Sequence, residues 1–161
     1  MEIYNHFEYA RRIARKLKDV EHTDKRPRFF EAHGIEDLYS FDEKLSSISG
    51  FVLIAVDGCE SESVYNGADG LFDSRHYAYI VACNTITDKP ASITLAMEKS
   101  RAICKQIRNA LFADMNLTGY LSRNTAINGI GPIGENFYGC MLSIDIDEPD
   151  DRGFNKDFWL K

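Results

Sequence analysis

The segment from Gly129 to Gly134 has the spacing G-x-G-x-x-G. In dinucleotide-binding proteins this spacing lets a turn approach a pyrophosphate at the N-terminus of a helix. Here residues 136–147 follow, and they alternate apolar and polar side chains, which predicts a strand. Because no helix is predicted there to direct a dipole at a phosphate, we interpret the motif as a glycine-rich turn.

Acidic residues gather in two segments. One holds Asp145, Asp147, Glu148, Asp150 and Asp151, and the other holds Glu60, Glu62, Asp69 and Asp73. Carboxylates suit Ca²⁺ or Mg²⁺, but this spacing matches no calcium loop and lacks its glycine. We interpret both segments as solvated acidic surfaces.

Histidine and cysteine are the other residue types that could do chemistry. The histidines are His6, His22, His33 and His76, and the cysteines are Cys59, Cys83, Cys104 and Cys140. Their spacing fits neither a zinc site nor a Cys-x-x-Cys pair. A nucleophilic pair such as Cys83 with His76 stays open, because catalytic partners meet in space. The sequence predicts no metal, no cofactor and no enzymatic activity.

Charge is segregated along the chain. The 161 residues include 19 Lys and Arg against 25 Asp and Glu, a net charge of −6, which disfavours a general nucleic-acid binder. Residues 57–73 and 135–151 contain acidic but no basic side chains. By contrast, Arg101, Lys105 and Arg108 share one face of a predicted helix, and Arg11, Arg12 and Arg15 form a second basic patch. A solvated face, a contact between basic and acidic surfaces of two subunits, and nucleic-acid binding all stay open.

Three aromatic residues stand near the C-terminus, beyond the last predicted strand. These are Phe154, Phe158 and Trp159, at positions i, i+4 and i+5. So short a segment can hide them only by folding back on its own domain or by docking on a neighbour. Aromatic side chains are frequent anchors of protein interfaces.

Hydrophobic periodicity predicts the elements that position these residues. An amphipathic helix is expected over residues 3–17, short helices and a loop over 29–50, and a buried strand over 51–56. A long loop over 58–75, a strand over 76–83 and a helix from about Pro90 to Asp114, with Asp88 as its cap, follow. Loops and a weak strand are expected over 116–134.

The last predicted strand covers residues 136–147 and is stopped by Pro149. Cys140, Leu142, Ile144 and Ile146 alternate with Met141, Ser143, Asp145 and Asp147, so one face should be buried and the other wet. The elements predict an α+β fold with a mainly antiparallel sheet and two long helices packed on one face. Residues 1–150 form a single domain, and residues 151–161 form a C-terminal arm. The charged N-terminus and the short apolar runs predict an intracellular protein with reduced cysteines and no membrane span.

This organisation resembles the small tail-terminator and tail-completion proteins of the head–tail junction of tailed phages and related contractile particles. The resemblance spans about residues 3–147. It is carried by the N-terminal helix, the strand Phe51 to Val56, the long loop, the segment Tyr77 to Cys83, the helix Pro90 to Asp114 and the late strand Phe137-Tyr138-Gly139-Cys140-Met141-Leu142-Ser143-Ile144-Asp145-Ile146.

The resemblance implies a structural virion protein, assembled in the host cytoplasm, that forms a ring, often a hexamer, on the last ring of the tail tube. Its partners would be copies of itself, tail-tube and head-connector proteins, and DNA in transit. Asp145 and Asp147 would face the channel, where carboxylates repel phosphates. Arg101, Lys105, Arg108, Phe154, Phe158 and Trp159 would lie at subunit contacts. The alternatives are a small adaptor or regulatory protein that binds its partner through the aromatic arm, and a small enzyme with a spatially assembled site.

Overall fold

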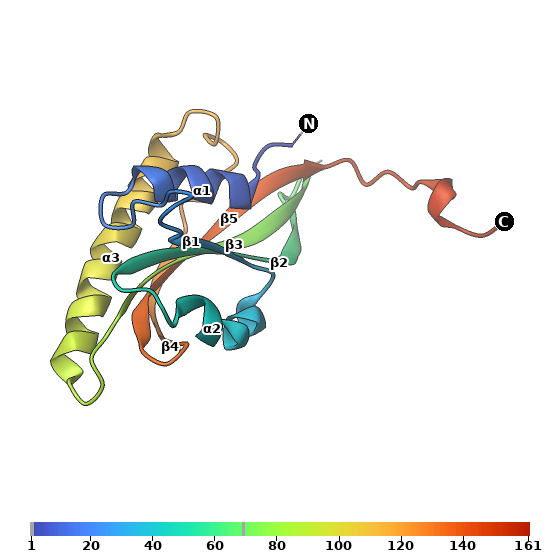
Figure 1. The fold of residues 1–161 in the computed structure, drawn as a ribbon. Coiled ribbons are helices and arrows are strands. Elements are labelled where there is room, and N and C mark those ends of the chain that lie inside the picture. Colours follow the sequence, from blue (N-terminus) through green and yellow to red (C-terminus); the bar gives the residue numbers. More distant parts are fainter. Residues whose placement is uncertain (1, 69) are drawn as a thin grey trace.

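The computed structural model describes residues 2–68 and 70–161 and has the predicted α+β fold (Figure 1). Its elements are α1 (His6–Lys16), β1 (Phe29–Ala32), the 3-10 helix η1 (Ile35–Ser40), α2 (Asp42–Leu45), β2 (Phe51–Tyr65), β3 (Leu71–Asn84), α3 (Pro90–Ala113), β4 (Ala126–Ile133), β5 (Phe137–Asp150) and the 3-10 helix η2 (Lys156–Phe158). The helices among these residues are too short or too polar to cross a membrane.

The five strands of the described residues form one sheet in the order β1-β2-β3-β5-β4. β1 is parallel to β2, and the other neighbours are antiparallel. β3 and β5 pair along their whole length, from Leu71 opposite Asp150 to Asn84 opposite Phe137. β3 and β5 therefore run from the end of the sheet near Asn84 and Phe137, which is covered on both faces, to the end near Leu71 and Asp150, where one face is open to solvent.

Both long helices pack on the same face of the sheet, as predicted. α1 buries Ala10 and Ala14, and α3 buries Ile103, Ile107 and Leu111 against this face. The sheet contributes its alternate side chains to the same core, and these are Leu53, Ala55, Tyr77, Tyr79, Val81, Cys140, Leu142, Ile144 and Ile146. The predicted buried side of the last strand is thus confirmed.

The opposite face of the sheet is covered over only part of its length. Phe41 and Leu45 pack there on Val52, Ile54 and Ile80. Residues 60–66, which continue β2 past this cluster and lead into the turn, are exposed. The uncovered end of the sheet is consequently open to solvent on this face, and Asp145 lies there.

The predicted long loop over residues 58–75 is wrong. After a register shift between Val56 and Glu60, β2 continues to Tyr65 and pairs with β3 down to Leu71. Backbone hydrogen bonds to β3 stabilise this polar extension, and its few apolar side chains give no strand pattern in the sequence. Pro149 also does not stop β5, because the strand runs on to Asp150.

Two further details differ from the sequence prediction. Residues 29–50 contain the short strand β1, a parallel edge strand that the sequence did not indicate. Asp88 is not the cap of α3: it has a φ of +64°, and Lys89 occupies the cap position without a side-chain bond. Instead, the Ser92 hydroxyl accepts a hydrogen bond from the Ile86 amide at 3.0 Å.

Candidate interaction surfaces

Four carboxylates meet on the open end of the sheet, and we call this group the acidic surface: Glu60, Glu62, Asp145 and Asp147. The register places Glu60, His76 and Asp145 in one cross-strand row, and Glu62, Ser74 and Asp147 in the next. Directly opposite residues on paired strands have their side chains on the same face. The structure thus brings Asp145 and Asp147 together with two carboxylates of the region that the sequence predicted to be a loop. Asp69, named with that segment, lies outside the described residues.

His76 is the titratable partner of Asp145 within this surface. Its Nδ1 lies 2.5 Å from Oδ1 of Asp145, and both side chains are about one-third exposed. The hydrogen bond to Asp145 raises the pKa of His76, and the charges of Asp145, Glu62 and Glu60 raise it further, while burial opposes the shift. The charge of the acidic surface therefore depends on the protonation of His76.

Arg101, Lys105 and Arg108 lie along α3, on the side of the sheet opposite the acidic surface, and we call them the basic stripe. Arg101 donates to the carbonyl oxygen of Ile127 at 3.4 Å, and Arg108 donates to Oδ1 of Asn109. None of the ion pairs between described residues involves the stripe. Its three charges are consequently available to an external anionic partner.

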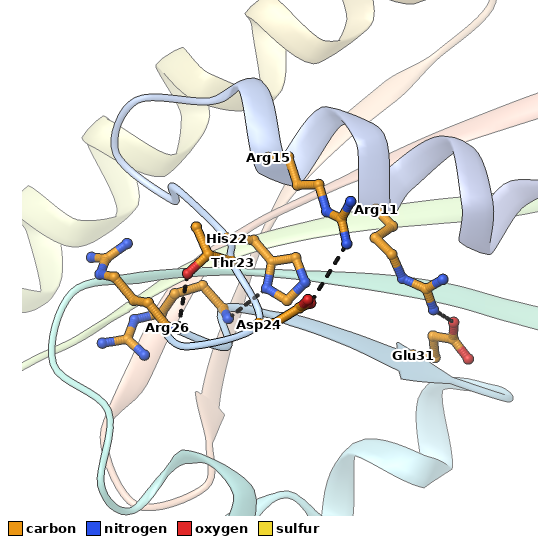
Figure 2. A network of polar contacts seen from close by, with 8 residues as sticks. Arg11, Arg15, His22, Thr23, Asp24, Arg26 and Glu31 are labelled. Carbon is orange, nitrogen blue, oxygen red and sulfur yellow. Dashed lines mark hydrogen bonds and ion pairs between the residues drawn. The ribbon is translucent and has the colours of Figure 1, made fainter.

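The second basic patch, on α1, is largely engaged within the chain (Figure 2). Arg11 pairs with Glu31 of β1 at 2.8 Å, and Arg15 lies 3.7 Å from Asp24. Arg12 stacks over the ring of Tyr9, 5.4 Å from its centroid. This patch helps to attach α1 to the segment before β1, so it is a weaker candidate for an intermolecular contact than the basic stripe.

The C-terminal arm, residues 151–161, leaves the end of β5 and points away from α3 (Figure 1). Every residue of the arm is exposed, and Phe158 retains 85% of its surface. The rings of Phe154 and Trp159 stack on each other at 5.6 Å between centroids. Of the two arrangements left open by the sequence, folding back on the same domain is therefore not the one observed.

A groove lined by both apolar and polar residues lies beside the C-terminal end of α3. It has a volume of about 450 Å³, and its lining includes Leu111, Phe112, Leu117, Leu121 and Arg123. Phe112 stands one helical turn beyond Arg108, so the basic stripe leads directly into the groove. Sequence periodicity did not reveal it, because the segment after α3 supplies most of the lining.

The cysteines do not form the nucleophilic pair that the sequence left open. Cys83 and His76 lie seven residues apart on one strand, about 23 Å at 3.3 Å per residue, and point to opposite faces. Burial raises the pKa of the Cys104 thiol to about 12 and also raises the pKa values of Cys83 and Cys140. These three thiols are protonated at neutral pH and are poor nucleophiles.

A buried polar network that the sequence did not indicate joins the N-terminal segment to β3. Nε2 of His6 donates to the carbonyl oxygen of Ala78 at 2.8 Å, which leaves Nδ1 to accept from the Tyr4 hydroxyl at 2.8 Å. The Tyr4 hydroxyl in turn hydrogen-bonds to that of Tyr79. Burial lowers the pKa of His6 to about 4, so the ring stays neutral, and we assign the network a structural role. The spacing of His6 with Ala10 and Ala14, one residue every four, was a signal that His6 lies on the buried face of α1, although not of its partners.

Most of the glycine motif, from Gly129 to Ile133, lies within strand β4, and only Gly134 lies in the turn to β5, so the interpretation of the whole motif as a glycine-rich turn is wrong for its first five residues. Among the described residues, no group of three or more His, Cys, Asp or Glu side chains could hold a metal ion. A hollow of about 680 Å³ between α1 and the end of α3 contains Tyr9, whose hydroxyl donates to Asp114 at 2.7 Å. Burial, followed by this hydrogen bond, raises the pKa of Tyr9, so its phenol is a poor general base at neutral pH.

A comparison with protein-family models finds none that matches the chain, and a comparison with curated proteins finds no match. Function therefore has to be inferred from the acidic surface, the basic stripe, the groove and the arm.

Proposed function

We propose that this protein is a structural subunit that self-associates into a ring, in the manner of a tail-terminator or tail-completion protein at the head–tail junction of a tailed phage or related contractile particle. The observation that carries the proposal is the arm. Four large apolar side chains, those of Phe154, Phe158, Trp159 and Leu160, are exposed to between 64% and 103%. An apolar segment of this kind is stabilised when a neighbour covers it.

The separation of charge on the folded domain also supports a ring. The acidic surface and the basic stripe lie on opposite sides of the sheet, so they cannot neutralise each other within one chain. A head-to-tail contact uses two different surfaces of each subunit, and it generates a ring where the rotation between subunits closes. The basic stripe would take part in that contact and meet carboxylates outside the acidic surface, where opposite charges favour the correct register.

In such a ring the acidic surface would line the channel. Asp145 and Asp147, with Glu60 and Glu62 beside them, would repel the phosphates of passing DNA and keep the duplex from adhering. No base-specific contact is required for this role, and the net charge of −6 is compatible with it. The virion would be the final location of the protein, with assembly in the host cytoplasm.

Negative-stain microscopy and light scattering of the full-length chain test this proposal. Closed rings, alone or on the ends of purified tail tubes, are the expected result. A chain that is monomeric at all concentrations and does not bind to tail tubes would refute it. The adaptor alternative, in which the arm binds a different protein, predicts a monomer that forms a complex only with that protein.

A further inference from the structure

We infer that the basic stripe on α3 of one copy of this chain docks on the exposed side of η1 and α2 of the next copy. This inference rests on the proposed ring and specifies the carboxylates that meet the stripe. They belong to a group outside the acidic surface that we call the η1–α2 patch, which contains Glu36, Tyr39, Asp42 and Glu43.

The basic stripe and the η1–α2 patch lie on opposite faces of the sheet. α3 buries Ile103 and Ile107 in the core on one face, whereas Leu38 of η1 and Leu45 of α2 belong to the core on the other (Figure 1). The stripe and the patch of one chain therefore cannot meet each other. A head-to-tail contact between successive subunits joins two such surfaces, and it covers both of them at once.

The η1–α2 patch is an exposed acidic surface with an aromatic residue in it. Between residues 35 and 45 the chain has four acidic residues and one basic residue, Lys44, whose ammonium group lies over the ring of Phe41. None of the ion pairs between described residues involves the carboxylates of the patch. Tyr39 stands among these carboxylates and keeps 84% of its surface exposed. Tyrosine is frequent among the residues that anchor protein interfaces.

α3 presents the opposite charge. The helix contains four basic residues and one acidic residue, Glu98. Arg101 and Lys105 of the stripe are exposed, and Arg108 is half-buried. A contact of the stripe with a second stripe, or of the patch with a second patch, would bring like charges together, whereas a contact of stripe with patch brings opposite charges together. The charges therefore favour a head-to-tail arrangement over a symmetric dimer through either surface.

The spacing of the side chains agrees with this contact. Residues i and i+3 of a 3-10 helix lie on the same side, so Glu36 and Tyr39 are neighbours on η1, about 6 Å apart at 2.0 Å per residue. Arg101 and Lys105 are four residues apart on α3, which is also about 6 Å at 1.5 Å per residue. The Arg101 guanidinium can thus pair with Glu36 while the Lys105 ammonium lies over the ring of Tyr39.

The test reverses the charges in the full-length chain. The stripe variant combines Arg101→Glu with Lys105→Glu, the patch variant combines Glu36→Lys with Glu43→Lys, and the swap variant carries all four changes. Because the four side chains are exposed, these variants should fold, which their circular dichroism spectra and melting temperatures will check.

Lys18→Glu with Lys25→Glu is the matched control for the stripe variant. It makes the same change in net charge at two exposed lysines outside α3, and neither lysine takes part in the ion pairs between described residues. Tyr39→Ser tests the aromatic part of the contact without a change in charge.

Sedimentation velocity should show the wild type and the control variant as oligomers. The stripe variant and the patch variant should each associate more weakly by about 30-fold or more, because like charges then face each other. The swap variant should associate at least about 10-fold more tightly than either of them, since opposite charges meet again. Loss of the Tyr39 ring should weaken association by about 10-fold.

A stripe variant or a patch variant that assembles as tightly as the wild type would overturn this inference and leave the proposed ring intact. A swap variant that associates no more tightly than the stripe and patch variants would overturn it in the same way, because the two surfaces would then have different partners. A wild type that never self-associates would overturn both proposals, so the two failures are distinguishable.

Discussion

Substitution of Gly139 by alanine should strongly destabilise the domain, because this glycine allows the closest approach of two central strands. A Cβ placed on Gly139 would lie 1.8 Å from the carbonyl oxygen of Val81 and 2.7 Å from Cα of Ala82. Ordinary contact begins at 3.4 Å, so β3 and β5 would have to separate by about 3.4 − 1.8 = 1.6 Å. Both neighbours are fully buried backbone positions and have no flexible side-chain end that could move.

A separation of that size exceeds the range of a hydrogen bond, so the pairing of Val81 with Cys140 and of Ala82 with Gly139 would be lost locally. Together with overpacking, this should cost about 3 kcal/mol of unfolding free energy or more. For a domain of this size the melting temperature should fall by about 6–12 °C, as measured by circular dichroism or calorimetry.

Gly129→Ala is the matched control on β4. There the nearest atom to a new Cβ is the flexible terminal methyl of Met97 at 3.3 Å. We expect a change below about 1 kcal/mol, because the thioether can move aside. A melting temperature for Gly139→Ala within about 2 °C of the wild type would refute the close strand approach.

Three further predictions concern the acidic surface, the thiols and the arm. Because the pKa of His76 is raised in the folded state, the stability that His76 contributes is present below its unfolded pKa and is lost as the pH rises through the folded pKa. Chemical denaturation should therefore show a larger loss of unfolding free energy in His76→Gln near pH 5 than near pH 8. Asp145→Asn should remove this difference. At neutral pH, iodoacetamide should modify the exposed Cys59 rapidly and Cys104 only on unfolding, as read by peptide mass spectrometry; equal rates in the native protein would contradict the buried, protonated state of Cys104. Deletion of residues 152–161 should leave the melting temperature within about 2 °C while it weakens self-association, and a sharp fall in melting temperature would mean that the arm contributes to the core.

Periodicity in the sequence predicts the elements that bury a regular apolar pattern. The continuous run from Phe51 to Val56, the alternation from Cys140 to Ile146 and the stripe on α3 all belong to this class, and all are observed. The extension of β2 from Glu60 to Tyr65 could not be predicted in this way, because backbone pairing holds polar side chains in a strand without burial.

The residues of the candidate surfaces also divide into those that a local sequence pattern predicts and those that it does not predict. Asp145 and Asp147 could be placed on a wet face from their own strand, whereas Glu60, Glu62 and His76 join them only through cross-strand register. The groove and the buried pairing of Tyr4 with Tyr79 depend on residues far apart in the chain, and such contacts leave no local pattern. The position of the arm is likewise a property of the folded chain.

The measurement that tests the central claim most directly is the mass of the full-length chain in solution, followed by sedimentation equilibrium over a wide range of concentration. The proposed ring predicts a defined closed oligomer that dissociates when Phe158 and Trp159 are replaced by serine. A strict monomer at every concentration, with the arm intact and tail tubes present, would contradict the account.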